Sequence, residues 1–126
     1  MAEPDRPTAQ TEDAQVKKFR KELNAGTVSL VLLSILAKSD EPMYGYQIAK
    51  EIEQSEDGQP LVKQGALYPV LRSMSALGLL ASRVEPSSSG PPRRYYEITA
   101  DGRTTLNHWE DEWRRTRSFV DAVLDD

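Results

Sequence analysis

The sequence predicts a mainly α protein with a small β-hairpin (α+β). Apolar side chains recur at helical spacing in several segments of the 126 residues, and two short alternating segments flank a run rich in proline and serine. A chain of this length forms one domain with room for a disordered end. The absence of cysteine excludes disulfides and thiolate sites, and a single histidine argues against a metalloenzyme or a Ser-His-Asp hydrolase.

Four helical segments precede the hairpin. They are expected at residues 15–24, from residue 24 or 27 to about residue 38, at residues 45–54, and from residue 65 or 66 to residue 78. Asn24 or Thr27 can cap the second helix, because a side-chain oxygen there accepts a bond from a free helical amide. The polar residues 39–42, which end in proline, then form a stop and a turn.

The last helix before the hairpin has a clear buried side. Leu67, Leu71 and Met74 recur at spacings of four and three, which marks the stripe that faces the core. Pro69 requires a helix start just ahead of it, because proline is tolerated only in or near the first turn. Gly78 is a good C-terminal stop.

The hairpin and a long final helix complete the chain. Residues 80–85 and 95–99 alternate as strands do, and residues 86–92 form a protruding loop whose prolines keep it out of both strands. Thr99 can cap a helix that runs from residue 100 to about residue 124. Its apolar seam has heptad-like spacing. The seam consists of Leu106, Trp109, Trp113, Thr116, Val120 and Val123.

This order of elements is that of a winged helix-turn-helix domain with an added C-terminal helix. We expect a disordered N-terminal tail at residues 1–14, a winged helix-turn-helix domain at residues 15–99 and a dimerisation helix at residues 100–126. No apolar run has the roughly 18 residues that a membrane span needs, and the N-terminus lacks the apolar centre of a signal peptide. A cytoplasmic location is therefore expected.

The distribution of charge changes what the total suggests. The net charge of −4 argues against nucleic acid as a partner. Residues 61–103, however, hold six basic and three acidic side chains, a net charge of +3, between acidic blocks of −4 and −3. A polyanion should therefore meet the protein at this basic segment, or at the smaller basic cluster at residues 17–21.

The basic segment contains candidate contacts to DNA. In a helix-turn-helix protein the N-terminal part of the second motif helix enters the major groove. The outer side of that helix carries Gly65, Pro69, Arg72 and Ala76, with Tyr68 at its flank. Lys63 and Gln64 precede it as candidate phosphate or base contacts. Structural alternatives remain: Tyr68 packs beside the hairpin, Lys63 and Arg72 are ordinary solvated charges, and Arg93 and Arg94 balance Glu85.

Three segments, taken together and in order, resemble the PadR family of transcriptional regulators. They are Met43 to Ile48 (MYGYQI), Gly65 to Leu80 (which opens with GALYPVL and ends with LGLL) and Arg93 to Gly102 (RRYYEITADG). The resemblance covers about residues 28–106. It implies a homodimeric repressor of a palindromic operator, and the single terminal helix matches the shorter subclass of the family.

The resemblance also assigns residue roles. Tyr68 would contact phosphate, Gly65 would permit close approach, and Arg93 and Arg94 would anchor the wing on the DNA backbone. Ala66 departs from the hydroxyl residue that many members carry, so one contact to DNA is missing. The expected DNA-binding residues are Tyr44, Lys63, Gln64, Gly65, Ala66, Tyr68, Pro69, Arg72, Arg93 and Arg94.

The two tryptophans predict a partner for the last helix. Trp109 and Trp113 lie on one helical side and need a surface that removes them from water. Dimer packing through Leu106, Trp109, Trp113, Val120 and Val123 provides one, and an apolar cavity for a small aromatic effector is a second interpretation. His108 has no second ligand nearby, so no metal and no cofactor is expected.

Two function classes follow from these observations. The first is a sequence-specific DNA-binding regulator, which the element order and the basic segment favour. The second is a winged-helix protein-interaction module that does not bind DNA, which the acidic total and Ala66 favour. An enzyme is not expected, because Ser87, Ser88 and Ser89 have no positioned base and no phosphate-binding glycine loop is present.

Overall fold

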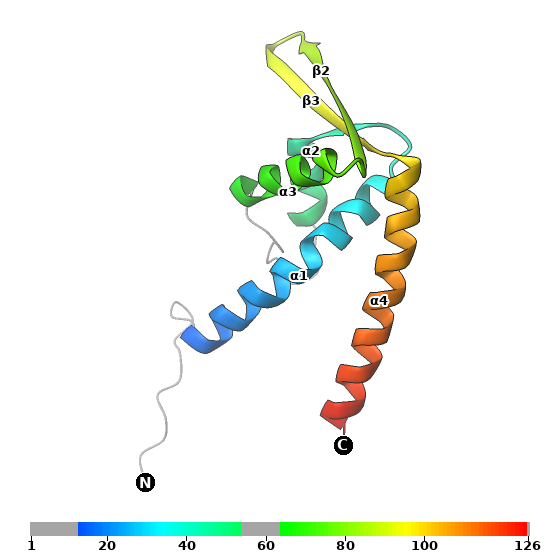
Figure 1. Ribbon diagram of the computed structural model, residues 1–126. Helices are drawn as coiled ribbons and strands as arrows, with labels where there is room; N and C mark the ends of the chain where they lie inside the picture. The colour runs from blue at the N-terminus through cyan, green and yellow to red at the C-terminus, as the bar shows by residue number, and fades with distance from the viewer. Residues whose placement is uncertain (1–12, 54–63, 126) are drawn as a thin grey trace.

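A computed structural model describes residues 13–53 and 64–125 of the chain (Figure 1). This part forms helices and one antiparallel sheet, so the α+β fold class is confirmed. The elements are α1 (Ala14–Lys38), β1 (Met43–Tyr44), α2 (Gly45–Glu53), α3 (Gln64–Ala76), β2 (Leu80–Ser87), β3 (Gly90–Ile98) and α4 (Ala100–Asp125).

Helix α1 is one continuous helix, so the prediction of two helices in this segment is wrong. The Thr27 hydroxyl donates to the Leu23 carbonyl at 3.1 Å and to the Asn24 carbonyl at 3.4 Å, which is a bond inside a helix rather than a cap. The cap lies earlier, where Asp13 Oδ1 accepts from the Gln15 amide at 2.7 Å. The expected tail lies outside the described residues, except for Asp13 and the first helical residue, Ala14.

The core lies where α1, α2 and α3 meet the base of the sheet. The predicted stripe of α3 is confirmed, because Leu67, Leu71 and Met74 are almost completely buried. The fully buried side chains of the other helices are Leu32, Leu33 and Ile48. From α4, Leu106 is buried and Trp109 packs against the cluster. The N-terminal part of α4 therefore belongs to the same core as the helix-turn-helix.

The hairpin is longer than predicted, and the loop expected at residues 86–92 is wrong. Strands β2 and β3 continue to Ser87 and from Gly90, and only Ser88 and Ser89 form the turn. The pairing register shifts between Glu85 and Ser87, so Pro86 lies in an irregularity of the ladder, where a missing amide costs little. The hairpin projects beyond the helices as a wing (Figure 1).

A short third strand was not predicted. In β1, Met43 pairs with Tyr96 and Tyr44 with Tyr95, which gives the sheet order β1-β3-β2. Two residues are too few to show the alternation of a strand, and the partners lie about fifty positions away along the chain. This pairing attaches the start of α2 directly to the wing strand.

One threonine joins α3, the sheet and α4. The Thr99 hydroxyl accepts from the Gly102 amide at 2.9 Å, which confirms the predicted cap of α4, and donates to the Gly78 carbonyl at 2.7 Å. Gly78 ends the α3 turn with φ of +79°, a conformation that suits glycine. Helix α4 then runs away from the domain and diverges from α1 (Figure 1).

Candidate nucleic-acid interface and helical contact surface

The outer side of α3 is exposed and carries mostly short side chains. Gly65, Ala66, Pro69 and Arg72 are all exposed there, opposite the buried stripe. A Cβ atom added to Gly65 would meet nothing within 4 Å, so the helix start is open to a close partner. The expected contact Lys63 lies outside the described residues, and Gln64 is placed only as the first residue of α3.

Tyr68 lies between α3 and α2. A Cβ atom on Gly45 would lie 2.5 Å from Tyr68 Cε1 and 2.8 Å from Tyr68 Oη, so the ring packs directly on the first residue of α2. Tyr68 is nevertheless 37% exposed. The ring thus packs on α2, and part of the side chain remains available at the surface. Tyr68 also lies near enough to Tyr96 of the wing to affect the pKa of that hydroxyl, so packing of the ring beside the hairpin stays a prediction.

Arg94 reaches across the wing on the side that faces α3. Its Nη1 atom donates to Ser82 Oγ at 3.2 Å, and Tyr96 lies next to it on the same side of β3. Burial raises the pKa of the Tyr96 hydroxyl, while the nearby positive charges of Arg94 and Arg72 act in the opposite direction. Arg72 of α3 and Arg94 of the wing therefore both place positive charge near the same buried tyrosine.

Arg93 points to the opposite side of the sheet, because consecutive strand residues alternate. Its guanidinium lies 4.5 Å from the centre of the Tyr44 ring, a cation–π contact. Glu85 is paired with Arg93 through the backbone, but its carboxylate binds Arg83 Nε at 2.7 Å. The alternative in which Arg93 and Arg94 balance Glu85 is therefore wrong, and the two arginines serve different surfaces.

The apolar seam of α4 leaves the core after its second turn. Leu106 is buried and Trp109 is half-buried, whereas Trp113, Val120 and Val123 are 39%, 44% and 58% exposed. Phe119 is exposed beside them, although the heptad spacing did not include it. Helix α1 adds further exposed apolar side chains, at the spacing that the sequence shows. These are Val16, Phe19 and Leu23.

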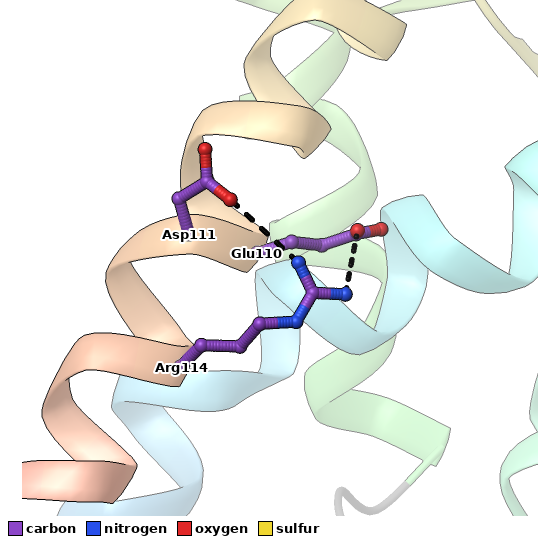
Figure 2. A network of polar contacts seen from close by, with 3 residues as sticks. All are labelled: Glu110, Asp111 and Arg114. Carbon is purple, nitrogen blue, oxygen red and sulfur yellow. Dashed lines mark hydrogen bonds and ion pairs between the residues drawn. The ribbon is translucent and has the colours of Figure 1, made fainter.

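The rest of the α4 surface carries ion pairs along the helix. Arg114 pairs with Glu110 at 3.4 Å and with Asp111 at 3.6 Å. Figure 2 shows these three side chains. Further along, Arg115 pairs with Glu112 and Arg117 with Asp121. Such exposed pairs contribute little to stability, typically about 0.3–0.5 kcal/mol each. Most of these charged side chains lie away from the apolar seam, although Glu112 lies at its edge, next to Trp113 in the chain.

A groove of about 500 Å³ lies between α1 and α4. It is lined mainly by apolar and small side chains, with a carboxylate from each helix. The lining residues are Glu22, Leu23, Gly26, Thr27, Ser29 and Leu30 of α1, and Trp109, Glu112, Trp113 and Thr116 of α4. Both tryptophans therefore border a single hollow.

Other kinds of site find no support in the part of the chain that the structure describes. Among residues 13–53 and 64–125, no three His, Cys, Asp or Glu side chains gather where they could hold a metal ion. None of the helices described above is long and apolar enough to cross a membrane.

These features define a class of protein. Helices α2 and α3, a hairpin wing beside them and basic side chains on both make a winged helix-turn-helix protein. The family model for the transcriptional regulator PadR-like family matches residues 32–108. The chain belongs to this family, and the resemblance seen in the sequence is confirmed.

Solved structures give the same result. A PadR family transcriptional regulator from Eggerthella lenta is 34% identical, with a TM-score of 0.74 over 87% of this chain and 92% of that chain. A PadR family transcription regulator from Clostridium difficile is 32% identical, with a TM-score of 0.64 over 78% and 98%. A PadR-like transcriptional regulator from Bacillus cereus is 28% identical, with a TM-score of 0.67 over 83% and 98%. These relatives are transcriptional regulators rather than enzymes.

Proposed function

We propose that this regulator is a cytoplasmic, homodimeric repressor that binds a palindromic operator in double-stranded DNA. One observation carries the proposal: Arg72 is exposed on α3, Arg94 donates to Ser82 Oγ across the wing, and both cations lie near enough to Tyr96 to affect its pKa. A helix and a wing that present cations together match a groove and its flanking phosphates. The family to which the chain belongs supports this assignment.

Each part of α3 has a role in this proposal. Gly65 and Ala66 let the helix start approach the base edges closely, and Pro69 adds a flat apolar surface without an amide donor. Lys63 and Gln64 are the candidates for phosphate and base contacts at the N-terminal end of α3. Because Ala66 has no hydroxyl, binding depends more strongly on the cations and on Tyr68.

The charge pattern makes DNA binding strongly dependent on salt. The logarithm of the affinity falls by roughly 0.9 for each phosphate neutralised per decade of salt. With Arg72, Arg93, Arg94 and Lys63 from both protomers, we expect a slope of roughly −4 to −7 on that scale. Salt-independent binding would contradict the proposal.

A mobility-shift experiment tests the function directly. The probe is the DNA upstream of the protein's own gene, and the variant is Arg93→Ala/Arg94→Ala. The wild type should bind and the variant should bind at least tenfold more weakly. Arg115→Ala is the matched control, since it removes an exposed cation from α4. If the wild type also fails to bind at low salt, a winged-helix protein-interaction module becomes the better description.

The exposed apolar side of α4 supports the homodimer. Trp113, Val120 and Val123 face solvent on a single chain and would be covered by a second copy. A dimer also places two wings on one DNA, which adds avidity. We expect Val120→Asp or Trp109→Ala to shift the protein toward monomer in sedimentation and to weaken DNA binding at the same time. A monomeric wild type would contradict this part.

The groove between α1 and α4 supports a small aromatic effector that relieves repression. Trp109 and Trp113 border this groove and offer ring surfaces for stacking. Titration with a panel of small aromatic compounds should quench or shift tryptophan emission. A compound that does so should also release the operator DNA in the mobility-shift experiment. Unchanged emission across the panel would contradict an effector at this position.

A further inference from the structure

A single hydrogen bond sets the direction of the Arg94 side chain on the wing. In the ladder between β2 and β3, Val84 lies directly opposite Arg94, and Ser82 lies opposite Tyr96. The Arg94 guanidinium nevertheless donates to Ser82 Oγ, at 3.2 Å, and so reaches one diagonal step toward the base of the wing. This step brings the charge next to Tyr96, which is almost completely buried.

The position of Arg94 is unfavourable without this bond. Arg72 of α3 also places positive charge near Tyr96, so two like charges lie close together. The acidic residues of the two strands, Glu85 and Glu97, lie on the other side of the sheet, because consecutive strand residues alternate. Repulsion between the guanidinium groups would therefore move Arg94 away from α3, unless another group held it there.

Ser82 is suited to hold Arg94 without blocking it. Both side chains are exposed, and in the described part of the chain Arg94 has no other hydrogen bond and no ion pair. An exposed arginine has many rotamers of similar energy, so a ligand that binds it has to fix the side chain at a cost in entropy. The hydroxyl of Ser82 removes part of this cost in the free protein. A guanidinium has several N–H donors, and those not used by Ser82 remain available for a phosphate.

We propose that Ser82 is a positioning residue, which holds Arg94 beside Arg72 so that the wing and α3 present their cations to DNA as a pair. This inference rests on the proposed function, in which both arginines contact DNA. It adds a residue that acts on DNA only through Arg94. Without the hydroxyl, the charge of the wing is unchanged but its position is not fixed.

The first test is a double-mutant cycle, measured by mobility shift with the DNA upstream of the protein's own gene. Ser82→Ala should weaken binding roughly three- to tenfold, because Arg94 keeps its charge and loses its fixed position. Ser82→Thr keeps a hydroxyl acceptor and should restore the wild-type affinity. In an Arg94→Ala background, Ser82→Ala should have no further effect. Ser118→Ala, at an exposed position of α4, is the matched control and should leave the affinity unchanged.

The second test follows the position of Arg94 without DNA. Burial raises the pKa of the Tyr96 hydroxyl, and the positive charge of Arg94 lowers it. Ser82→Ala should let Arg94 move away and should therefore raise this pKa, whereas Ser82→Thr should leave it unchanged. Ultraviolet titration of the tyrosines measures the shift, and Tyr96→Phe identifies the ionisation that belongs to this residue. Circular dichroism checks that each variant is folded.

The outcomes separate this inference from the proposed function. If the wild type binds DNA and Ser82→Ala leaves either the affinity or the Tyr96 titration unchanged, Ser82 does not position Arg94, and only the inference is overturned. Stronger binding by Ser82→Ala would overturn it as well. If Ser82→Ala still weakens binding in the Arg94→Ala background, Ser82 contacts DNA itself and the positioning role is wrong. If the wild type does not bind DNA at low salt, the proposed function fails together with the role of Ser82 in binding.

Discussion

The ring of Tyr68 lies on the first residue of α2, at Gly45, so closely that no side chain larger than hydrogen fits between them. The helix-turn-helix is therefore held by a contact in which α3 supplies the ring and α2 supplies only backbone. The ring therefore packs against the backbone of α2. The same contact fixes the part of Tyr68 that remains exposed for a partner.

Gly45→Ala should disturb this contact. An added Cβ atom would lie 2.5–2.9 Å from three atoms of the Tyr68 ring, so the ring has to move. We expect a loss of about 1–3 kcal/mol in the free energy of unfolding, measured with denaturant, as is usual for overpacking. We also expect DNA affinity to fall at least tenfold. In a Tyr68→Ala background the space is free, and Gly45→Ala should no longer destabilise. Equal destabilisation in both backgrounds would contradict this account.

Alanine substitutions at two other glycines should change the stability of the protein in opposite directions. A Cβ atom on Gly102 would collide with the Leu79 carbonyl oxygen and lie 2.7 Å from Ile98 Cγ1, so Gly102→Ala should destabilise the protein by several kcal/mol. Gly26 lies inside α1 with nothing within 4 Å of its added Cβ. Gly26→Ala should therefore stabilise α1 by about 0.5–1 kcal/mol. Thermal unfolding of both variants checks the contrast.

Thr99→Val should weaken the junction between α3 and α4. It removes the acceptor for the Gly102 amide and the donor to the Gly78 carbonyl while keeping the side-chain shape. We expect a decrease of about 1–2 kcal/mol in the free energy of unfolding. The control is Thr104→Val on the same helix, whose exposed hydroxyl only bonds back to the Ala100 carbonyl at 3.3 Å. A decrease of similar size in the control would contradict a special role for Thr99.

The parts of the fold that depend on local periodicity can be predicted from the sequence. The spacing of Leu67, Leu71 and Met74 indicates which side of α3 is buried, and a helix shows this without reference to its neighbours. Capping is less certain from sequence. A threonine such as Thr27 can start a helix, but its hydroxyl can also bond to a carbonyl four residues back, and α1 continues through it.

Features that depend on distant partners cannot be predicted in this way. Pro86 is accommodated because the ladder shifts its register beside it, which only the paired strand decides. The stacking of Tyr44 against Tyr46 arises where β1 ends and α2 begins, so neither a helical nor a strand period describes it. The separation of Arg93 from Arg94, by contrast, follows from strand alternation alone.

Tyr96 provides a test that depends on pH. Burial raises the pKa of its hydroxyl above the ordinary value of 10.0. The folded protein therefore keeps this proton at a pH where the unfolded chain has lost it. The resulting stabilisation is complete below pH 10 and is lost as the pH rises through the folded-state value. Tyr96→Phe should remove this part of the pH dependence of unfolding. The ultraviolet titration of the tyrosines should then lose the ionisation that occurs at the highest pH.

The arginines beside Tyr96 make the same titration sensitive to the proposed DNA-binding surface. The positive charges of Arg94 and Arg72 favour the ionised phenol, so Arg94→Ala or Arg72→Ala should raise the pKa of Tyr96 further. Arg93→Ala should have a smaller effect, because Arg93 lies on the opposite side of the sheet, over Tyr44. Equal shifts from Arg93→Ala and Arg94→Ala would show that the two arginines share one surface, and would contradict the division of the wing into an α3-facing side and a side that carries Arg93.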